Sequence, residues 1–463
     1  MKKLHIIILI LALAFGAKEV NGQTPPQVVV DSLQAILNQA LPSNFQNSGV
    51  IMSVYAPGQW TWSGAVGNGI AGISAQQPQT NASVTDRFRV GSITKMMVAV
   101  CILKLEQDGL LSIEDPIDMY LRPTLVNDTI APSDTVRIRH LLNHTSGIAN
   151  SGSNTACQQN VLTDPLGNHS LEEAIYCGAS QGELFPPEFA WGYSNTNYSI
   201  LAMIIETITG QSYSSYLTQT IITPLNLTQT EIPVSNQISG PHMGCYWNIG
   251  NWIDLTIINP TTYTGWADVV SSTQDLITFY EALRNGQLID STSWTEMQTM
   301  YPGTFGYGLG LDFYTITSQN YVGHYGEVAN TSGLFFADIH SSLCPNGYYI
   351  AYNFNVQGAD MQNYIDVPVL LFLNNNVNGV AEMNSSEKFQ VFPNPCSDYL
   401  QIKTNENASA LITLTDLSGR ILNPAVTRSS GVQLLDVSGL PRGAYILSIT
   451  EGMYTETHKV ILE

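Results

Sequence analysis

One stretch, residues 88–111 (FRVGSITKMMVAVCILKLEQDGLL), constrains the fold most, because reactive side chains open a long apolar run. The run from Met96 to Leu103 is nearly continuous, and Gly109 is a typical residue for ending a helix. A helix that is apolar on every face is buried, so its first turn would be held rigidly in the interior. Ser92 and Lys95 are three residues apart and therefore share one helix face. The pattern predicts a serine nucleophile beside a lysine base, near the positive end of a helix.

The same residues also have a simpler interpretation. A Ser-x-x-Lys pair is short enough to occur by chance, and serine often caps a helix without any chemical role. The chain contains a second such pair, Ser385 and Lys388, in a polar stretch with no apolar helix behind it. Such a motif is meaningful only in its structural context, so the rest of the chain has to decide.

Composition excludes one class of partner. The chain has 463 residues, which is enough for two or more domains, and a formal net charge of −20. An acidic surface repels phosphate backbones, and no cluster of Lys and Arg is visible in the sequence. Nucleic acid is therefore not expected as a partner.

The first residues have the pattern of an export signal. Lys2 and Lys3 precede an apolar run, Leu4 to Phe15, and small residues precede Gln23. The run is shorter than a membrane span, and no other segment reaches about 18 apolar residues. We expect residues 1–22 to be a cleaved signal peptide and the mature chain to have no membrane span.

Six cysteines suit an oxidising compartment, and their spacing does not suggest zinc. Cys101 lies within the apolar run and is expected to behave as a small buried hydrophobe. Cys157 and Cys177 flank a polar insertion and are the candidate disulfide.

Apolar periodicity predicts an α+β fold, with one antiparallel sheet flanked by helices. Residues 26–41 have helical spacing, and residues 50–66 alternate around the turn Ala56-Pro57-Gly58 as a hairpin does. Residues 115–285 have the pattern of helices and loops. Strand patterns return at residues 306–314, 319–323, 331–338 and 348–354, before a last helix at 364–373. A sheet built from both ends, with a helical region inserted, accounts for this order.

The last part of the chain differs in character. Residues 377–388 are polar and typical of a linker, and residues 389–463 have the short alternating strands of a small all-β sandwich. The expected division is a signal peptide (1–22), a main domain (24–376), the linker and this C-terminal domain.

Six motifs in the main domain occur in a characteristic order. They are FRVGSITK (88–95), HLLNHTSGI (140–148), WGYSNTNYSILAMIIE (191–206), TGWADVVSSTQDLITFYEAL (264–283), YGLGL (307–311) and GHYG (323–326). In this order they resemble the serine β-lactamase-related family, which has the β-lactamase/transpeptidase-like fold. The family includes class C β-lactamases, D-alanyl-D-alanine carboxypeptidases, D-aminopeptidases and esterases. The resemblance covers roughly residues 24–373.

The resemblance implies a catalytic group of Ser92, Lys95 and Tyr193. Ser92 would be the nucleophile, and Lys95 could accept its proton only if burial lowers the pKa from about 10.4. Tyr193 would relay the serine proton and later protonate the leaving group. Asn195 would bind a substrate carbonyl. No metal or cofactor is required.

The resemblance also implies that the triplet His324-Tyr325-Gly326 lines the substrate site. The oxyanion would lie between the backbone N–H groups of Ser92 and Glu327, and the strand could pair with an extended acyl-peptide. Relatives that bind a substrate carboxylate firmly often have lysine where this chain has His324, followed by a small hydroxyl residue. Because histidine is mostly neutral at pH 7, these departures weaken the case for efficient β-lactam hydrolysis.

Several other residues match parts of these patterns. The segments Tyr246-Trp247-Asn248 and His242-Met243-Gly244 match the bare motifs but lack the flanking helix or strand. The family places His144 in a structural turn. Trp191 and Trp266 could equally line a pocket or fill the core.

The C-terminal domain resembles the type IX secretion sorting domain. The resemblance rests on FQVFPNP (389–395), LTDLSGRIL (414–422) and LPRGAYILSI (440–449). It implies a partner in the type IX secretion machinery and export through the periplasm of a gram-negative bacterium. A carbohydrate-binding or adhesive sandwich is the alternative.

These patterns together predict an exported serine hydrolase that forms an acyl-enzyme on Ser92. We expect a D-alanyl-D-alanine carboxypeptidase-like or related peptidase, acting on a small or peptide substrate. A carboxylic ester hydrolase or β-lactamase of the same family is the alternative. An inactive penicillin-binding-like protein on the cell surface is the alternative of another class, against which the intact Ser92, Lys95 and Tyr193 argue.

Overall fold

The computed structural model describes residues 23–41, 47–73, 77–121, 130, 134–301, 306–316, 319–375, 390–392, 396, 399–403, 411–416, 421–422, 425–429, 432–451 and 454–462. The predicted signal peptide, the linker and the second pair, Ser385 and Lys388, lie outside these residues. The chain divides into two units, one ending at Val377 and one starting at Asn378.

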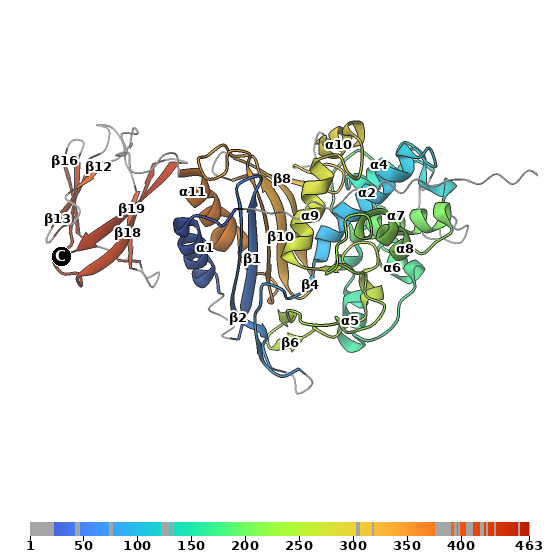
Figure 1. Ribbon diagram of the computed structural model, residues 1–463, viewed down its shortest axis with the longest axis horizontal. Helices are drawn as coiled ribbons and strands as arrows, with labels where there is room; N and C mark the ends of the chain where they lie inside the picture. The colour runs from blue at the N-terminus through green and yellow to red at the C-terminus, as the bar shows by residue number, and fades with distance from the viewer. Residues whose placement is uncertain are drawn as a thin grey trace, which may run out of the picture. The chain divides into compact units, whose positions relative to one another are not determined.

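A seven-stranded antiparallel sheet forms the centre of the first unit (Figure 1). Its order is β3 (Thr80–Asn81), β2 (Trp60–Ile70), β1 (Gly49–Ala56), β11 (Tyr348–Phe354), β10 (Thr331–Ala337), β9 (Gln319–Glu327) and β8 (Asp312–Ile316). β1 pairs with β11, with Val50 opposite Phe354. The prediction of one sheet built from both ends of the segment is therefore confirmed.

One predicted strand is shorter than its sequence pattern. We expected a strand over residues 306–314, but β8 begins only at Asp312. Gly306 and Gly310 have positive φ angles of 93° and 74°, which turn the chain instead of extending it. This turn carries Tyr307 toward the candidate site.

Helices cover both faces of the sheet (Figure 1). α1 (Gln27–Gln39) contacts β2 and α11 (Val367–Asn375), whereas α9 (Thr273–Arg284) contacts β1 and β11. The buried residues of α1 are Val29, Leu33 and Leu37, four residues apart, so a single apolar stripe attaches this helix to the sheet.

The inserted helical region surrounds two largely buried helices, α2 (Thr94–Gln107) and α7 (Asn195–Thr209), which contact each other. Every residue of α2 from Thr94 to Leu103 is buried, Cys101 included, as the apolar run predicted. Ser92 itself lies in a 3-10 turn (Gly91–Ile93) that precedes α2, not in its first α-helical turn. The other elements are α4 (Ile138–Leu142), α5 (Thr155–Thr163), α6 (Leu171–Ala179), α8 (Tyr213–Leu217), α10 (Ser291–Gln298), β4 (Phe88–Arg89), β5 (Tyr246–Asn248), β6 (Trp252–Asp254) and β7 (Val270–Ser271).

The second unit contains two four-stranded antiparallel sheets. The first orders β12 (Gln390–Phe392), β13 (Tyr399–Lys403), β17 (Val432–Asp436) and β16 (Ala425–Ser429); the second orders β15 (Ile421–Leu422), β14 (Leu411–Asp416), β18 (Gly443–Glu451) and β19 (Tyr454–Leu462). Leu400, Leu435 and Leu447 are buried in one apolar cluster of this unit. This arrangement confirms the predicted small all-β domain. Within the described ranges of the chain, no helix is long and apolar enough to cross a membrane.

Candidate active site

Ser92, Lys95 and Tyr193 meet at one point, although Tyr193 is far away in the sequence. Lys95 Nζ and Tyr193 Oη each lie 2.9 Å from Ser92 Oγ and are bound to it by hydrogen bonds. The turn before α2 supplies Ser92, and the residues just before α7 supply Tyr193. The packing of α2 against α7 therefore brings the three groups together.

The surroundings of Lys95 favour its neutral form. Its side chain is fully buried, and this burial holds the pKa well below 10.5, with Asp312 and Asp268 opposing part of the shift. Lys95 Nζ also donates hydrogen bonds to Asn195 Oδ1 at 2.9 Å and to the carbonyl oxygen of Trp266 at 3.1 Å. These contacts fix the position of the amine beside Ser92.

Tyr193 is held in its protonated form. Burial raises its pKa well above 10, and the hydrogen bond to Ser92 opposes this shift only in part. Its ring lies 4.3 Å, between centroids, from the ring of His144, whose Nδ1 accepts a hydrogen bond from the backbone N–H of Ser194. His144 thus lies behind Tyr193 and fixes the backbone next to it. Burial keeps the pKa of His144 well below 6.5, so this imidazole is uncharged.

A short turn positions the Trp266 carbonyl, and its residues were not recognised from the sequence. Asp268 is buried, and its carboxylate accepts hydrogen bonds from the backbone N–H of Gly265 at 3.2 Å and from Tyr213 Oη at 3.1 Å. Burial raises the pKa of Asp268 to about 7. The motif TGWADVV was noted in the sequence, but only the fold shows that the Trp266 carbonyl oxygen accepts a hydrogen bond from Lys95.

The 3-10 turn and β9 meet through their backbones next to Ser92. A Cβ atom on Gly91, where φ is 59°, would lie 2.4 Å from the backbone nitrogen of Glu327. A Cβ atom on Gly326 would lie 2.0 Å from the carbonyl oxygen of Val90. Both positions need glycine for this close approach. Gly326 therefore has a packing role, whereas Glu327 lies at the pocket itself.

His324 does not line the pocket as we had expected. It is only 2% exposed, its Nε2 lies 3.0 Å from Tyr307 Oη, and its Nδ1 lies 3.6 Å from Asp312. Burial lowers its pKa, with the Asp312 carboxylate opposing the shift. His324 belongs to a buried layer next to Tyr193, with the two ring centroids 6.4 Å apart, and is not among the residues that line the pocket.

The edge of β9 near Ser92 is not paired with another strand among the described residues. β8 pairs with β9 only from Gln319 to Gly323, so the segment from His324 to Glu327 extends past the end of β8. Its other edge is paired with β10. This arrangement is compatible with the expected pairing of an extended substrate.

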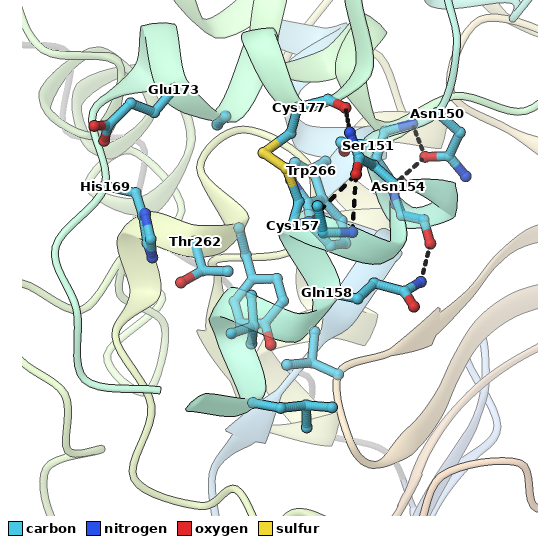
Figure 2. A pocket seen from close by; sticks show the side chains of 18 of the residues that line it. Asn150, Ser151, Asn154, Cys157, Gln158, His169, Glu173, Cys177, Thr262 and Trp266 are labelled. Atoms are coloured by element: carbon cyan, nitrogen blue, oxygen red, sulfur yellow. Dashed lines mark hydrogen bonds between the residues drawn. A yellow bond between two sulfur atoms is a disulfide. The ribbon is translucent and has the colours of Figure 1, made fainter. Parts of the chain in front are cut away.

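A pocket of about 1290 Å³ opens beside these groups (Figure 2). Ser92, Tyr193, Asn195, Trp266 and Glu327 line its catalytic side. Of the two tryptophans left open by the sequence, Trp266 therefore lines the pocket. The residues of the opposite side include the disulfide between Cys157 and Cys177, which confirms the predicted pair.

Comparison with known families gives two matches. The beta-lactamase family matches residues 38–369, and the secretion system C-terminal sorting domain matches residues 390–463. Among curated relatives, penicillin-binding protein 4* from Bacillus subtilis (strain 168) is 30% identical over 269 residues, covering 52% of this chain and 55% of that protein. The chain thus spans about half the length of the curated relatives it matches.

Solved structures share the fold of the first unit. A D-stereospecific amidohydrolase from Streptomyces sp. is 26% identical with a TM-score of 0.63, covering 74% of this chain and 98% of that one. The D-amino acid amidase from Ochrobactrum anthropi SV3, solved with L-phenylalanine amide, is 22% identical with a TM-score of 0.60. That match covers 74% of this chain and 96% of the amidase, and at this identity it shows the fold alone.

Proposed function

This chain belongs to the beta-lactamase family, and we propose that it is an exported serine hydrolase that cleaves D-alanyl-type peptides or amides through an acyl-enzyme on Ser92. The observation that carries the proposal is the pair of hydrogen bonds at Ser92 Oγ, one shared with Lys95 Nζ and one with Tyr193 Oη. A serine that only caps a helix would have no need of a buried amine and a buried phenol.

The contacts of Lys95 suit a general base. A neutral amine has two N–H donors and one lone pair. Asn195 Oδ1 and the Trp266 carbonyl oxygen can accept from the two donors, which leaves the lone pair for the hydroxyl of Ser92. Burial supports the neutral form, since it lowers the pKa of this lysine.

The first half-reaction forms the acyl-enzyme. Ser92 Oγ attacks the substrate carbonyl carbon while its proton passes to Lys95 Nζ, and the backbone N–H groups of Ser92 and Glu327 stabilise the oxyanion. The bond from carbon to the leaving nitrogen then breaks. The proton returns from Lys95 through the Tyr193 hydroxyl to the leaving amine.

The second half-reaction releases the acid. A water molecule gives a proton to Lys95 and attacks the ester carbon, and the bond to Ser92 Oγ breaks as Lys95 returns the proton to this oxygen. The protein ends in its starting state, so these residues complete the cycle.

The relatives and the site support the proposed substrate class. The fold is shared with a D-stereospecific amidohydrolase, and the sequence is similar to that of a penicillin-binding protein, which favours a D-alanyl-D-alanine carboxypeptidase-like or related peptidase. A carboxylic ester hydrolase is the second candidate, because the buried His324 offers no cation to a substrate carboxylate. The same lack of a cation at His324 argues against a β-lactamase, which would also have to bind a substrate carboxylate.

The sorting domain supports the export part of the proposal. Residues 390–463 match a secretion system C-terminal sorting domain, and residues 1–22 have the pattern of a signal peptide. We propose that the protein crosses the inner membrane through the signal peptide and reaches the cell surface or the medium through the type IX machinery.

The test compares three purified proteins: the mature chain, Ser92→Ala and Tyr193→Phe. Each is incubated with a fluorescent penicillin, a short aryl ester and a D-Ala-D-Ala peptide. We expect covalent labelling that requires Ser92, and a fall of about 10²- to 10⁴-fold in acylation for Tyr193→Phe, the usual contribution of a general acid or base. The substrate turned over fastest ranks the peptidase and the esterase. The absence of both labelling and turnover would support the binding-protein alternative.

A further inference from the structure

Helix α5 forms one wall of the pocket, and none of its described side chains is fully buried in the core. Ala156, Cys157, Gln158, Val161 and Leu162 of α5 line the pocket together with Ser92. Of the α5 residues whose side chains are described, all are exposed or only partly buried. An isolated helix of this length is marginal in water, so its position has to be fixed by other contacts.

The disulfide provides a covalent contact of this kind (Figure 2). Cys157 is bonded to Cys177 of α6, a helix that buries Ile175 and Ala179 and packs against α7. Asn154, just before α5, donates a hydrogen bond to the Cys177 carbonyl oxygen at 2.7 Å. α5 is therefore attached to the same helical layer that carries the catalytic groups.

A second part of the pocket lining, next to α5, is apolar and aromatic. Trp247 of β5, Leu255, Tyr263 and Trp266 line it, and Val161 of α5 packs against the cluster that contains Leu255. The charged side chains that line the pocket are carboxylates, Glu172, Glu173 and Glu327, with neither Lys nor Arg among the described lining residues. The compartment thus suits an apolar group and disfavours an anionic one.

We propose that the compartment between α5 and Trp247 binds the side chain of the acyl group transferred to Ser92 and selects a bulky, apolar, uncharged one. We further propose that the Cys157–Cys177 disulfide determines this selectivity by holding α5 in place. The inference rests on the proposed acyl transfer at Ser92 and refines its substrate class: a D-alanyl group would still react, with a lower kcat/KM than a D-aromatic one. A methyl group would leave most of this space unfilled, whereas an aromatic side chain could contact both walls.

The test measures kcat/KM of the full chain on the para-nitroanilides of D-alanine, D-phenylalanine and D-glutamate. We expect D-phenylalanine to exceed both others by at least about 10-fold, the lower range of discrimination by an apolar pocket. The double variant Cys157→Ser, Cys177→Ser should reduce the ratio of D-phenylalanine to D-alanine to about 3-fold or less. Trp247→Ala should reduce the same ratio, because it removes an aromatic side chain from the pocket lining and leaves the disulfide intact.

Two controls make the result decisive. Cys344→Ala removes a buried free cysteine that belongs to a different apolar cluster and should keep the wild-type ratio. Labelling by fluorescent penicillin shows whether the nucleophile is still assembled in each variant. Turnover that depends on Ser92, with equal rates for the substrates or an unchanged ratio in both pocket variants, would overturn the inference alone. No Ser92-dependent turnover or labelling of any kind would overturn the acyl transfer and the inference with it.

Discussion

The pKa of Lys95 is the residue-level quantity on which the proposed reaction depends. Asn195→Asp would place a carboxylate where the amide oxygen now lies, 2.9 Å from Lys95 Nζ. A neighbouring carboxylate stabilises the ammonium form and raises a pKa by about 1–3 units. The base would then be protonated at neutral pH. We expect kcat/KM at pH 7 to fall by about 10- to 1000-fold and to recover partly as the pH rises.

The control for this prediction is Asn195→Ala. It removes the same hydrogen bond without adding a charge, so activity should fall without a shift of the acid limb of the pH profile to higher pH. An Asn195→Asp profile with the wild-type acid limb would contradict the role of Lys95 as the base.

Single residues also show which parts of the candidate site can be predicted from the sequence. Ser92, Lys95 and Tyr193 could be proposed from side-chain chemistry and motif order, and the structure brings their side chains together. The Trp266 carbonyl could not, because a backbone group has no signature in the sequence. His324 was assigned to the substrate site by resemblance, and this was wrong because the sequence does not show that Tyr307 and Asp312 enclose it.

At the scale of elements, the proposed oxyanion site depends on the contact of the 3-10 turn with β9. Gly91→Ala would bring a methyl group to 2.4 Å from the Glu327 nitrogen and would also strain a backbone with φ of 59°. The turn and the strand have to separate, which displaces one N–H group of the proposed oxyanion site. We expect acylation to fall by about 10²- to 10³-fold, as when one oxyanion donor is lost. Stopped-flow labelling measures this rate.

Gly109 offers a matched control for this substitution. It ends α2 with φ of 71°, and a Cβ atom there would meet open space. Gly109→Ala should therefore lower the free energy of unfolding by about 1 kcal/mol from backbone strain and leave acylation unchanged. Equal acylation rates in Gly91→Ala and Gly109→Ala would show that the close contact of Gly91 with β9 is not needed for acylation.

The element pattern also explains which boundaries were predictable. The hairpin of β1 and β2, and the buried α2, have clear alternation or apolar continuity in the sequence. The predicted start of β8 was wrong because Gly306 and Gly310 have positive φ angles, which turn the backbone inside a stretch whose sequence alternates like a strand. Glycine φ angles depend on tertiary contacts, such as that of Gly310 with Lys95 on α2, and these are not visible in one sequence.

At the scale of the whole molecule, buried carboxylates give stability a pH dependence. Asp366 is fully buried, accepts hydrogen bonds from Tyr325 and Tyr352, and has its pKa raised by burial to about 7. The folded state therefore binds more protons than the unfolded state between about pH 4 and pH 7, so the free energy of unfolding falls as the pH rises through this range. Asp366→Asn should flatten this dependence, which urea unfolding at a series of pH values measures. If the free energy of unfolding of Asp366→Asn changed with pH as steeply as that of the wild type, Asp366 would not be the source of this dependence.

The division into two units leads to a prediction about export. The sorting unit has its own buried cluster, which includes Leu400, Leu435 and Leu447, and the described residues that line the pocket all belong to the first unit. Deleting residues 389–463 should therefore leave an enzyme that fluorescent penicillin labels, retained in the periplasm of the producing cell. Ser92→Ala in the full chain provides the opposite case, because export should persist while labelling is lost. Fractionation followed by immunoblotting and labelling measures both properties. Undiminished export of the truncated chain would show that residues 389–463 are not its export signal, whatever the fate of the catalytic proposal.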